Sequence, residues 1–516
     1  MHPRLFARTD PDHAAVVIAE SDETLSYGAL EEAANRAAHL FRAIGLKRGE
    51  VVAAFLDNTP QYFVLAWATQ RCGLYLTTIS SRLTAGEAAY IVGDSGARAL
   101  VASGSLSEVA SAVAAAPEAA ALARRLAVDG PIPGFEDWTH SLSRFPSTPI
   151  PDESAGTYMF YSSGTTGRPK GVPYPLPEGT VEALDPGTAL RQPIYGWDRN
   201  TIYFHPAPLY HAAPLGFGCM IHRCGGTVLL AQRFDAEEAL AFIERYRVTH
   251  SQWVPTMFVR FLKLPPGVRE RHDLSSMTVA IHAAAPCSRS VKRQMMAWWG
   301  PILHEFYSGT EASGVTMIGP EEWLAKPGSV GKARMGVIHI IDDAGDEVPA
   351  GHEGAVYFEG GLDFKYLNDP AKTAESRLPG RTWSTMGDVG YVDEDGYLFL
   401  TDRKAYMIVT GGVNVYPQEV EDVLIAHPDV IDAAVFGVPN AEFGEEVKAV
   451  IQPVLNAPPT DELAEALRSW CRDRLSPVKH PRSFEFQSQL PREPTGKLLK
   501  RQLRDPYWVN HDSRIA

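Results

Sequence analysis

The 516-residue sequence has few cysteines, and they form no pattern that marks a metal site or a disulfide framework. Their number is odd and their positions are scattered: Cys72, Cys219, Cys224, Cys287 and Cys471. Small extracellular domains depend on paired cysteines, so this arrangement argues against that class and predicts reduced thiols.

Long apolar runs and an excess of positive charge are also missing. No run of about 18 apolar residues occurs, so no membrane-spanning helix is predicted. The N-terminal segment lacks the apolar core of a signal peptide. A formal net charge of −14 argues against nucleic acid or an anionic membrane as the main partner. These absences favour a soluble cytoplasmic protein.

The most informative feature that is present is a cluster of potential phosphate ligands. Residues 161–171 have the sequence Tyr-Ser-Ser-Gly-Thr-Thr-Gly-Arg-Pro-Lys-Gly. Glycines let backbone N–H groups approach phosphate oxygens, hydroxyls add donors, and Lys170 adds a positive charge. The spacing of Gly164, Gly167 and Lys170 differs from the P-loop pattern Gly-x-x-x-x-Gly-Lys-Ser/Thr. The apolar run 158–161 predicts a buried strand that leads into a polyphosphate-binding loop. A surface turn without function is the alternative.

The first part of the sequence, up to about residue 400, alternates between helical and strand-like patterns. Apolar residues recur at helical spacing from Leu30 to Ile44 and stop before Gly45. The alternation predicts further helices and strands at 51–56, 60–72, 227–230, 236–246, 277–281, 290–299 and 302–306. It is typical of an α/β domain in which helices cover parallel-rich sheets and ligands bind at the carboxyl ends of the strands.

Three segments interrupt this alternation. Residues 131–152 and 173–193 are rich in proline and glycine and are predicted to be loops. The second follows the phosphate loop directly, and both a lid and a plain surface insertion fit its length. Residues 109–127 are rich in alanine and predict a helix that breaks at Pro117.

The pattern changes after Gly390. Residues 391–400 predict a hairpin with Gly396 in its turn. A helix, two strands and a second helix are predicted beyond it, at 417–426, 433–438, 447–453 and 461–475. We therefore predict a large N-terminal domain, residues 1–402, and a small α+β C-terminal domain, residues 403–516.

Five segments carry a resemblance to one enzyme superfamily, in the order in which that superfamily has them. They are residues 161–171, Tyr-Ser-Gly-Thr-Glu at 307–311, Met-Gly-Asp at 386–388, Asp-Arg-Lys at 402–404 with Gly-Gly at 411–412, and Pro-Thr-Gly-Lys at 494–497. The chain resembles the adenylate-forming superfamily of acyl-CoA synthetases, peptide-synthetase adenylation domains and beetle luciferases. It is most similar to bacterial fatty-acyl-type acid:CoA ligases. The resemblance implies a mobile C-terminal domain and the use of ATP, Mg²⁺ and CoA.

The resemblance assigns an ATP site. The loop would hold the β- and γ-phosphates, Glu311 would coordinate Mg²⁺, and Thr310 would contact the α-phosphate. Tyr307 would lie against the adenine, and Asp388 and Arg403 would bind the ribose. By itself Glu311 could equally be an exposed acid, and Asp388 a turn residue. The implied ATP- and AMP-binding residues are Ser162, Ser163, Gly164, Thr165, Thr166, Gly167, Lys170, Ala284, Ala285, Pro286, Tyr307, Ser308, Gly309, Thr310, Asp388, Arg403 and Lys497.

The implied reaction joins a carboxylate to AMP, because a free carboxylate is a poor electrophile. Attack on the α-phosphate depends on positioning and on neutralisation of charge. In the superfamily a C-terminal lysine, here Lys497, bridges the carboxylate and the α-phosphate. The implied catalytic residues are Lys497, Thr310, Glu311 and Lys170. Lys500 and Arg501 are predicted to be solvated surface charges.

A second half-reaction would transfer the acyl group to a thiol. In the superfamily the small domain rotates after adenylation, and a segment like Gly411–Gly412 approaches the pantetheine arm of CoA. The chain departs from many relatives at the pivot, where Ala405 replaces aspartate or lysine.

The implied acyl pocket contains no acidic residue. Residues 212–221, which follow Leu-Tyr-His at 209–211, lack the aspartate with which peptide-synthetase domains bind an amino group. A free amino acid would bury an unpaired ammonium, so we expect a long-chain, aromatic or polycyclic acid. Core packing is the alternative role for each pocket residue, and a structural role is the alternative for His211. The candidates are His211, Phe217, Cys219, Trp253, Val254, His282, Ala284, Ala285 and Gly309.

The leading hypothesis is therefore an ATP-dependent acid:CoA ligase. The alternative is an adenylating enzyme that passes its acyl-AMP to a carrier protein or partner enzyme. A nucleotide-binding pseudoenzyme is the third hypothesis, and the intact set of motifs argues against it. The sequence leaves open the acid, the pathway and the oligomeric state, including a homodimer.

Overall fold

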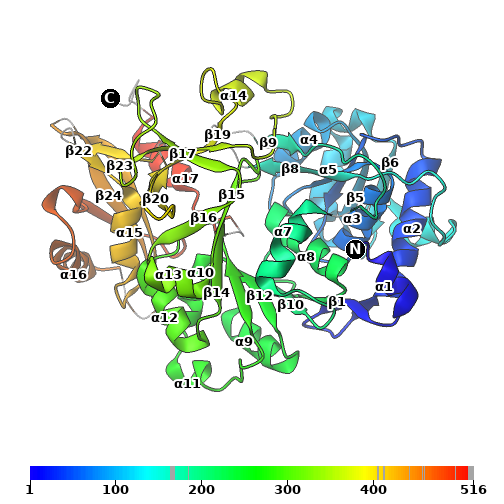
Figure 1. Ribbon diagram of the computed structural model, residues 1–516, viewed down its shortest axis with the longest axis horizontal. Coiled ribbons are helices and arrows are strands. Elements are labelled where there is room, and N and C mark those ends of the chain that lie inside the picture. Colours follow the sequence, from blue (N-terminus) through cyan, green and yellow to red (C-terminus); the bar gives the residue numbers. More distant parts are fainter. Residues whose placement is uncertain are drawn as a thin grey trace.

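The computed structural model describes residues 1–162, 169–183, 185–403, 406–410, 413–440, 442–455, 457, 459–493 and 496–509, with only the backbone of Arg403 (Figure 1). Within these residues the strands form sheets of 7, 13 and 5 strands. Helices cover the sheets, and the predicted α/β class is confirmed.

The seven-stranded sheet has the order β7-β6-β5-β3-β4-β8-β9. Its neighbours are parallel except for the last pair, β8 and β9. The strand predicted at 51–56 is confirmed as β3, in which every residue is buried. The strands are β3 (Val51–Phe55), β4 (Tyr75–Thr78), β5 (Ala97–Ser103), β6 (Arg124–Val128), β7 (Glu136–Asp137), β8 (Thr157–Ser162) and β9 (Lys170–Pro173).

The thirteen-stranded sheet contains a parallel block, β14-β13-β12-β10-β11-β1, that is continued by antiparallel strands at both ends. The parallel block brings the carboxyl ends of its strands to one edge. The strands are β1 (Ala14–Ile18), β2 (Thr24–Ser26), β10 (Ile202–His205), β11 (Thr227–Leu230), β12 (His250–Trp253), β13 (Val279–His282), β14 (Leu303–Tyr307), β15 (Val315–Ile318), β16 (Ser329–Met335), β17 (Val337–Ile341), β18 (Gly354–Glu359), β19 (Ser384–Val392) and β20 (Leu398–Arg403).

One hydrophobic core joins the two large sheets. It contains residues from α2 (Tyr27–Ala43), α3 (Gln61–Arg71) and α8 (Ala212–Cys224) together with strands of both sheets. The predicted helices at 30–44 and 60–72 are confirmed as α2 and α3. The other helices of this part are α1 (Arg4–Thr9), α4 (Ala85–Asp94), α5 (Ser107–Ala115), α6 (Trp138–Ser143), α7 (Pro186–Tyr195), α9 (Ala236–Arg245), α10 (Pro255–Leu262), α11 (Pro266–Arg269), α12 (Arg289–Trp299), α13 (Pro320–Ala325) and α14 (Pro370–Glu375).

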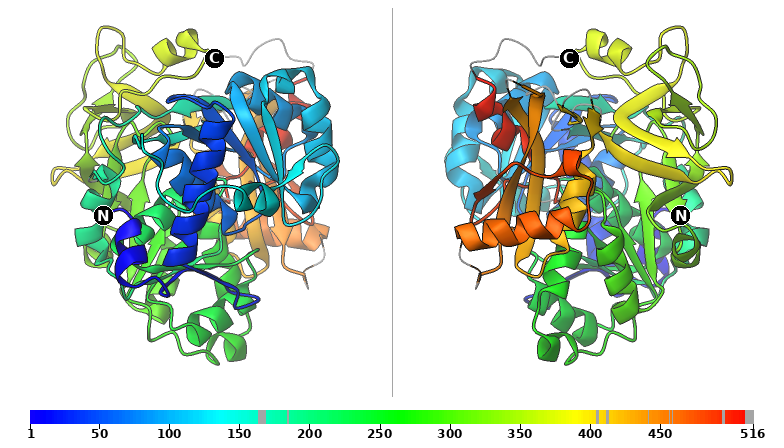
Figure 2. Two further views of the ribbon diagram at one scale, coloured as in Figure 1. Left: turned by 90° about the vertical axis from the view of Figure 1, so that its right-hand side faces the viewer. Right: turned by 90° about the vertical axis from the view of Figure 1, so that its left-hand side faces the viewer.

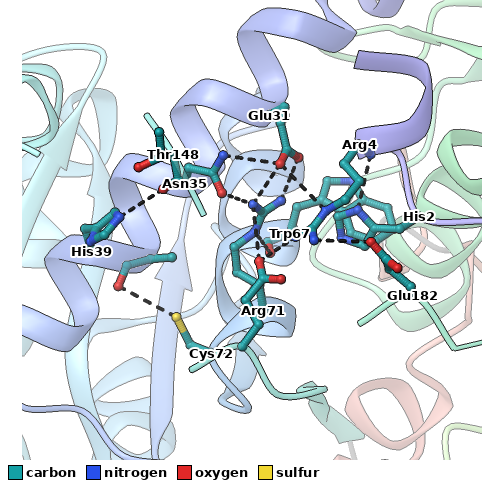
Figure 3. Close-up of polar contacts among 12 residues, drawn as sticks. His2, Arg4, Glu31, Asn35, His39, Trp67, Arg71, Cys72, Thr148 and Glu182 are labelled. Atoms are coloured by element: carbon teal, nitrogen blue, oxygen red, sulfur yellow. Dashed lines mark hydrogen bonds and ion pairs between the residues drawn. The ribbon is translucent and has the colours of Figure 1, made fainter. Parts of the chain in front are cut away.

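A network of charges, most of them buried, fastens the N-terminal residues to this core (Figure 3). The fully buried Arg71 of α3 pairs with Glu31 of α2 at 2.8 Å, and Arg4 pairs with Glu153 and Glu182. Burial alone would raise the pKa of the Glu31 carboxyl, but Arg71 and Arg4 outweigh it and hold the pKa below its usual value. The network therefore ties α1, α2 and α3 to the segment that follows β9.

The three interrupting segments differ in part from their predictions, although the predicted helix break at Pro117 is confirmed. Residues 131–152 include the strand β7 and the helix α6, which Asp137 caps by accepting a hydrogen bond from the His140 N–H at 2.6 Å. Residues 173–193 include most of α7, because Pro186 occupies the first turn, where a missing N–H has no cost. Residues 109–127 are helical only up to Ala115. A 3₁₀ turn follows, and 124–128 form β6 because they pair with β5.

The C-terminal unit is a five-stranded sheet with helices on it (Figure 2). The predicted hairpin before it is confirmed as β19–β20, with Gly396 at φ +83° in the connection. Lys263, just after α10, donates from Nζ to the His427 and Pro428 carbonyls and joins the unit to the large domain. Its elements are β21 (Ile408–Thr410), β22 (Val413–Val415), α15 (Pro417–Ile425), β23 (Val430–Asn440), β24 (Gly444–Pro453), α16 (Asp461–Arg472), β25 (Ser483–Phe486) and α17 (Lys500–Arg504).

Lys500 is not the surface charge that the sequence predicts. Its side chain is 7% exposed and its Nζ lies 2.8 Å from Glu421 Oε1 of α15. Burial raises the pKa of Glu421 to about 7, although Lys500 opposes the shift. Arg501 keeps its predicted exposure and pairs with Asp505 at 2.9 Å.

Candidate active site

The predicted phosphate loop connects two antiparallel strands. Ser162 of β8 pairs with Lys170 of β9, so the loop closes a hairpin at the edge of the seven-stranded sheet. A side chain at Gly171 would meet the Tyr161 ring at 2.9 Å, which explains the glycine at this position. Ser163, Gly164, Thr165, Thr166 and Gly167 lie outside the described residues.

Lys170 and Glu311 meet at Tyr366, a residue that the sequence analysis missed. Tyr366 donates a hydrogen bond from its hydroxyl to Glu311 Oε1 at 2.8 Å, and Lys170 Nζ lies 5.3 Å from the centre of its ring. Burial, followed by the Glu311 carboxylate, raises the pKa of Tyr366, so its hydroxyl remains a donor. Burial and Lys372 lower the pKa of Lys170. Two predicted phosphate- and metal-binding groups thus share one positioning residue.

Tyr307 and Asp388 also come together, from different strands. The Tyr307 hydroxyl, at the end of β14, donates to Asp388 Oδ2 at 2.6 Å. In the ladder between β19 and β20, Asp388 is the partner of Arg403, whose side chain lies outside the described part. The predicted adenine- and ribose-binding residues therefore converge at one place.

The turn after β14 is tightly packed. A side chain at Gly309 would meet Met386 Sδ at 2.5 Å and Glu311 Oε2 at 2.7 Å. The Ser308 hydroxyl donates to the Gly314 carbonyl at 2.9 Å, and the Thr310 carbonyl accepts from Tyr174 at 2.9 Å. These contacts hold the backbone of the turn beside Asp388.

Residues 284–286 follow β13, so they lie at the same sheet edge as the turn after the parallel neighbour β14. Ala284 has φ +75°, in the left-handed region that favours glycine. The backbone of Ala284 is therefore strained. Ala284 belongs to the segment predicted to contact adenine, which also contains Ala285 and Pro286.

The C-terminal segment brings Lys497 to the large domain. A side chain at Gly496, which has φ +78°, would meet Thr256 Oγ1 at 2.7 Å and Val254 Cγ2 at 3.0 Å. Burial lowers the pKa of His211 to about 3, and the nearby charge of Lys497 adds to the shift. Lys497 therefore follows a glycine that packs against the large domain, and its charge acts on His211, the residue that precedes α8.

Arg492, a second residue that the sequence analysis missed, holds the turn of Lys497. Its guanidinium donates to both carboxylate oxygens of Asp432, at 2.5 and 2.6 Å, and to the Gly496 carbonyl. The Gly496 N–H donates to the Glu493 carbonyl at 2.8 Å and closes the turn. Because the bidentate pair with Asp432 of β23 fixes the guanidinium, Arg492 orients the segment that carries Lys497.

The predicted acyl-pocket residues divide between two sides of the thirteen-stranded sheet. Phe217 and Cys219 lie on α8 in the core between the sheets. Trp253 packs instead against Phe204, Phe261 and Trp299 in the second core, with ring centres 5.1 to 5.6 Å apart. These ring contacts favour a structural role in the core for Trp253 over a role in the acyl pocket.

His282 faces the same second core. Its ring is fully buried and packs edge-on against Phe258 at 5.5 Å, and its Nε2 lies 3.5 Å from Glu305 Oε2. Lys292 of α12 pairs with Glu305 at 2.7 Å. His282 therefore belongs to a buried polar group behind the sheet, which again favours the structural alternative.

Glu311 suits a magnesium ion that is bound mainly by phosphate oxygens, because such an ion takes one or two carboxylates from the protein. The described residues contain no cluster of three or more histidines, cysteines or acids that would form a metal site of their own. Gly411 and Gly412, the predicted CoA contacts, lie outside the described ranges.

In the part of the chain that the structure describes, no helix is both long and apolar enough to cross a membrane.

Comparison with known proteins identifies the family. The model for AMP-binding enzymes matches residues 4–365, and the model for the AMP-binding enzyme C-terminal domain matches residues 419–497. The fatty acid–[acyl-carrier-protein] ligase ScoC of Streptomyces coeruleorubidus is 31% identical over 99% of this chain and 96% of its own. A feruloyl-CoA synthase of an Amycolatopsis species is 32% identical over 96% of both chains.

The fold is similar to that of ATP-bound MatB from Rhodopseudomonas palustris, with a TM-score of 0.82 and 28% identity over 99% of each chain. The predicted pairing of a large N-terminal and a smaller C-terminal domain is thereby confirmed. Adenylate-forming enzymes use ATP, and the relatives join acids to thiol acceptors of different kinds. The chain belongs to the family of AMP-binding enzymes and is an adenylate-forming acid ligase.

Proposed function

We propose that this protein is an ATP-dependent acid:CoA ligase. It joins a largely hydrophobic carboxylic acid to AMP with release of pyrophosphate, and then transfers the acyl group to the thiol of CoA. The observation that carries the proposal is the packing of Gly496, the residue before Lys497, against Val254 and Thr256 of the large domain, in a chain whose Tyr307 and Asp388 also meet.

In the first half-reaction, Lys170 and the hairpin loop hold the outer phosphates. Tyr307 and Asp388 hold the nucleoside, with Arg403 beside them in the ladder. The magnesium ion would be held by Glu311 and would neutralise charge on the phosphates. Lys497 places a positive charge where the carboxylate meets the α-phosphate. This charge stabilises the negative charge that develops there in the transition state.

The second half-reaction requires Lys497 to withdraw. We infer that the domain boundary lies at residues 402 and 403, that the small domain rotates there, and that Gly411 and Gly412 then approach CoA. The hydrogen bonds of Lys263 to His427 and Pro428 would break in this rotation. Free thiols at all five cysteines fit the cytoplasmic location that the proposal includes.

The alternative acceptor is a carrier protein. The similarity to ScoC, whose name assigns it an acyl-carrier-protein acceptor, favours this alternative. The similarity to a feruloyl-CoA synthase favours CoA. The CoA hypothesis and the carrier-protein hypothesis imply the same ATP-site residues, so an experiment must separate them.

The test begins with ATP–pyrophosphate exchange on a panel of short, long-chain, aromatic and polycyclic acids. The best acid is then incubated with ATP, Mg²⁺ and CoA, and products are identified by mass spectrometry. We expect acyl-CoA and AMP. Acyl-AMP that accumulates without a thioester would assign the carrier alternative, and an absence of exchange with every acid would overturn the adenylation proposal itself.

A further inference from the structure

A partly buried arginine lies on the ring of Phe217, at the centre of what we call the Phe217 cluster. The cluster comprises Arg191 and Tyr195 of α7, Trp197 just after it, and Phe217 of the neighbouring α8 (Figure 1). The Arg191 guanidinium lies 5.3 Å from the centre of the Phe217 ring, and the rings of Trp197 and Tyr195 lie 5.6 and 6.5 Å from it. The cluster combines an apolar ring with three polar groups.

Each of these three polar groups has a buried donor without a hydrogen-bond partner among the described residues. The donors are Arg191 Nε, the Tyr195 hydroxyl and Trp197 Nε1. Such orphaned donors are rare in protein interiors, because an unpaired buried N–H or O–H destabilises the fold. Three such donors around the Phe217 ring indicate a binding site for a ligand that carries hydrogen-bond acceptors.

Within the described residues Arg191 also forms no ion pair, and its guanidinium donates a hydrogen bond to the Gly187 carbonyl at 3.3 Å. The nearby Asp185 is engaged elsewhere, since it caps α7 through the N–H and hydroxyl of Thr188. Burial lowers the pKa of Arg191, yet a guanidinium keeps its charge in any protein environment.

The cluster is continuous with the site of adenylation. Phe217 stacks on Phe306 at 5.3 Å, close to the carboxyl end of β14, although Phe306 and Tyr307 face opposite sides of the sheet. Tyr174 packs against the same hydrophobic core as Phe217, and its hydroxyl donates to the Thr310 carbonyl at 2.9 Å, which links this core to the turn after β14. An acid that extends along α8 from the reacting carboxylate therefore reaches the cluster.

The spacing along α8 gives the distance between the reacting carboxylate and the Phe217 cluster. His211, on which the charge of Lys497 acts, caps the amino end of α8, and Phe217 lies six positions further along. This spacing corresponds to about 9 Å of helix rise. A group that meets Arg191 would thus lie on the order of 9 Å from the activated carboxylate.

We propose that Arg191, with Tyr195 and Trp197, binds a second anionic oxygen group at the far end of the acid, either a carboxylate or a phenolate. All three groups donate hydrogen bonds, and a guanidinium matches an anionic oxygen in both charge and geometry. The inference rests on the proposed function and narrows it: the acid is apolar in the middle, where it meets Phe217, and charged at both ends.

The test compares matched pairs of acids in ATP–pyrophosphate exchange. One arm uses linear dicarboxylates of graded length and their mono-methyl esters, and the other uses para-hydroxyaryl acids and their methyl ethers. We expect kcat/KM to be at least tenfold higher for the anionic member of one arm, and Arg191→Met to abolish that preference. The loss of kcat/KM in Arg191→Met should be about tenfold greater for the anionic member than for the neutral member, and Arg191→Lys should keep part of the preference.

Arg223→Met is the matched control. Arg223 likewise lies over an aromatic ring, that of Trp67 at 5.2 Å, and bonds to Gln70, but it is outside the Phe217 cluster. Its loss should leave the ratio between anionic and neutral acids unchanged. Equal rates with both members in the wild type, or an equal loss with both in Arg191→Met, would overturn the inference while the adenylation proposal stands. No exchange with any acid would overturn both.

Discussion

At the scale of single residues, Tyr366 is the contact that most directly links two parts of the ATP site. Replacing it by phenylalanine removes the hydrogen bond to Glu311 and keeps the ring beside Lys170. A hydrogen bond to a charged group contributes about 1.5–3 kcal/mol, so we expect kcat/KM for ATP to fall about tenfold or more. The rate of pyrophosphate exchange at graded Mg·ATP measures this. Tyr391→Phe is the control, and a Tyr366→Phe enzyme with wild-type kinetics would contradict the assignment.

For Ala284 we predict a substitution that stabilises the protein. Its φ of +75° lies in the region where an alanine is strained and a glycine is not. Ala284→Gly should therefore raise the free energy of unfolding by about 1 kcal/mol, although the more flexible unfolded chain offsets part of the gain. Denaturant titration with and without ATP measures the change. A clear loss of stability would show that the side chain makes contacts that outweigh the strain.

The single-residue contacts also show what the sequence could not reveal. Tyr366 is 55 positions from Glu311, and Arg492 is 60 positions from Asp432, so neither pair stands in a recognisable local pattern. Strand alternation likewise shows that neighbours face opposite ways but not which face meets the acid. For that reason the acyl-pocket interpretation of Trp253 and His282 finds no support in their packing.

At the scale of elements, the contacts of Arg492 with Asp432 and with the Gly496 carbonyl position Lys497. Arg492→Leu removes the link between Asp432 and the Gly496 carbonyl, so Lys497 loses its fixed position. A displacement of about 1 Å in a catalytic group can lower a rate about 100-fold, and we expect an effect of this order on adenylation. Thioester formation from synthetic acyl-AMP should change little.

The control for that variant is Arg468→Ala, which breaks an exposed ion pair with Glu465 on α16 and should alter neither half-reaction. A loss of both half-reactions in Arg492→Leu, together with a lower melting temperature, would assign Arg492 to folding and not to the holding of Lys497.

The order of the elements was largely predictable. Apolar periodicity predicts α2, β3 and α3, because a sheet covered by helices repeats one pattern many times. The rule that ligands bind at the carboxyl ends of parallel strands also predicts the place of Tyr307. The errors fall where proline starts a helix, as at Pro186, or where an alanine-rich segment forms β6 because β5 offers pairing.

At the scale of the whole molecule, the contact between the two domains contains a group that titrates near neutral pH. Burial raises the pKa of Asp422 on α15 to about 6, while Gln418 on the same helix and Arg289 of the large domain oppose the shift. The folded state therefore holds this proton more tightly than the unfolded chain. Stability from this group is present at low pH and is lost as the pH rises through about 6.

Asp422→Asn should accordingly raise the melting temperature at pH 8, by an amount equivalent to about 1–2 kcal/mol. The difference from the wild type should shrink towards pH 4.5, where Asp422 is itself protonated in the folded state. Thermal melts across this pH range measure the difference. A stabilisation that is the same at every pH would show that the carboxyl does not titrate at this contact.

The central claim is that Lys497 serves adenylation and withdraws before thioester formation. The most direct measurement is the rate of each half-reaction in Lys497→Ala, with Lys479→Ala, which loses an ion pair with Glu419, as the control. We predict that acid-dependent pyrophosphate exchange falls at least about 100-fold, as expected for a charge that stabilises the transition state. Acyl-CoA formation from synthetic acyl-AMP should stay within about twofold of the wild type, since Lys497 has left the site. Normal exchange in Lys497→Ala, or an equal loss in both half-reactions, would contradict the account.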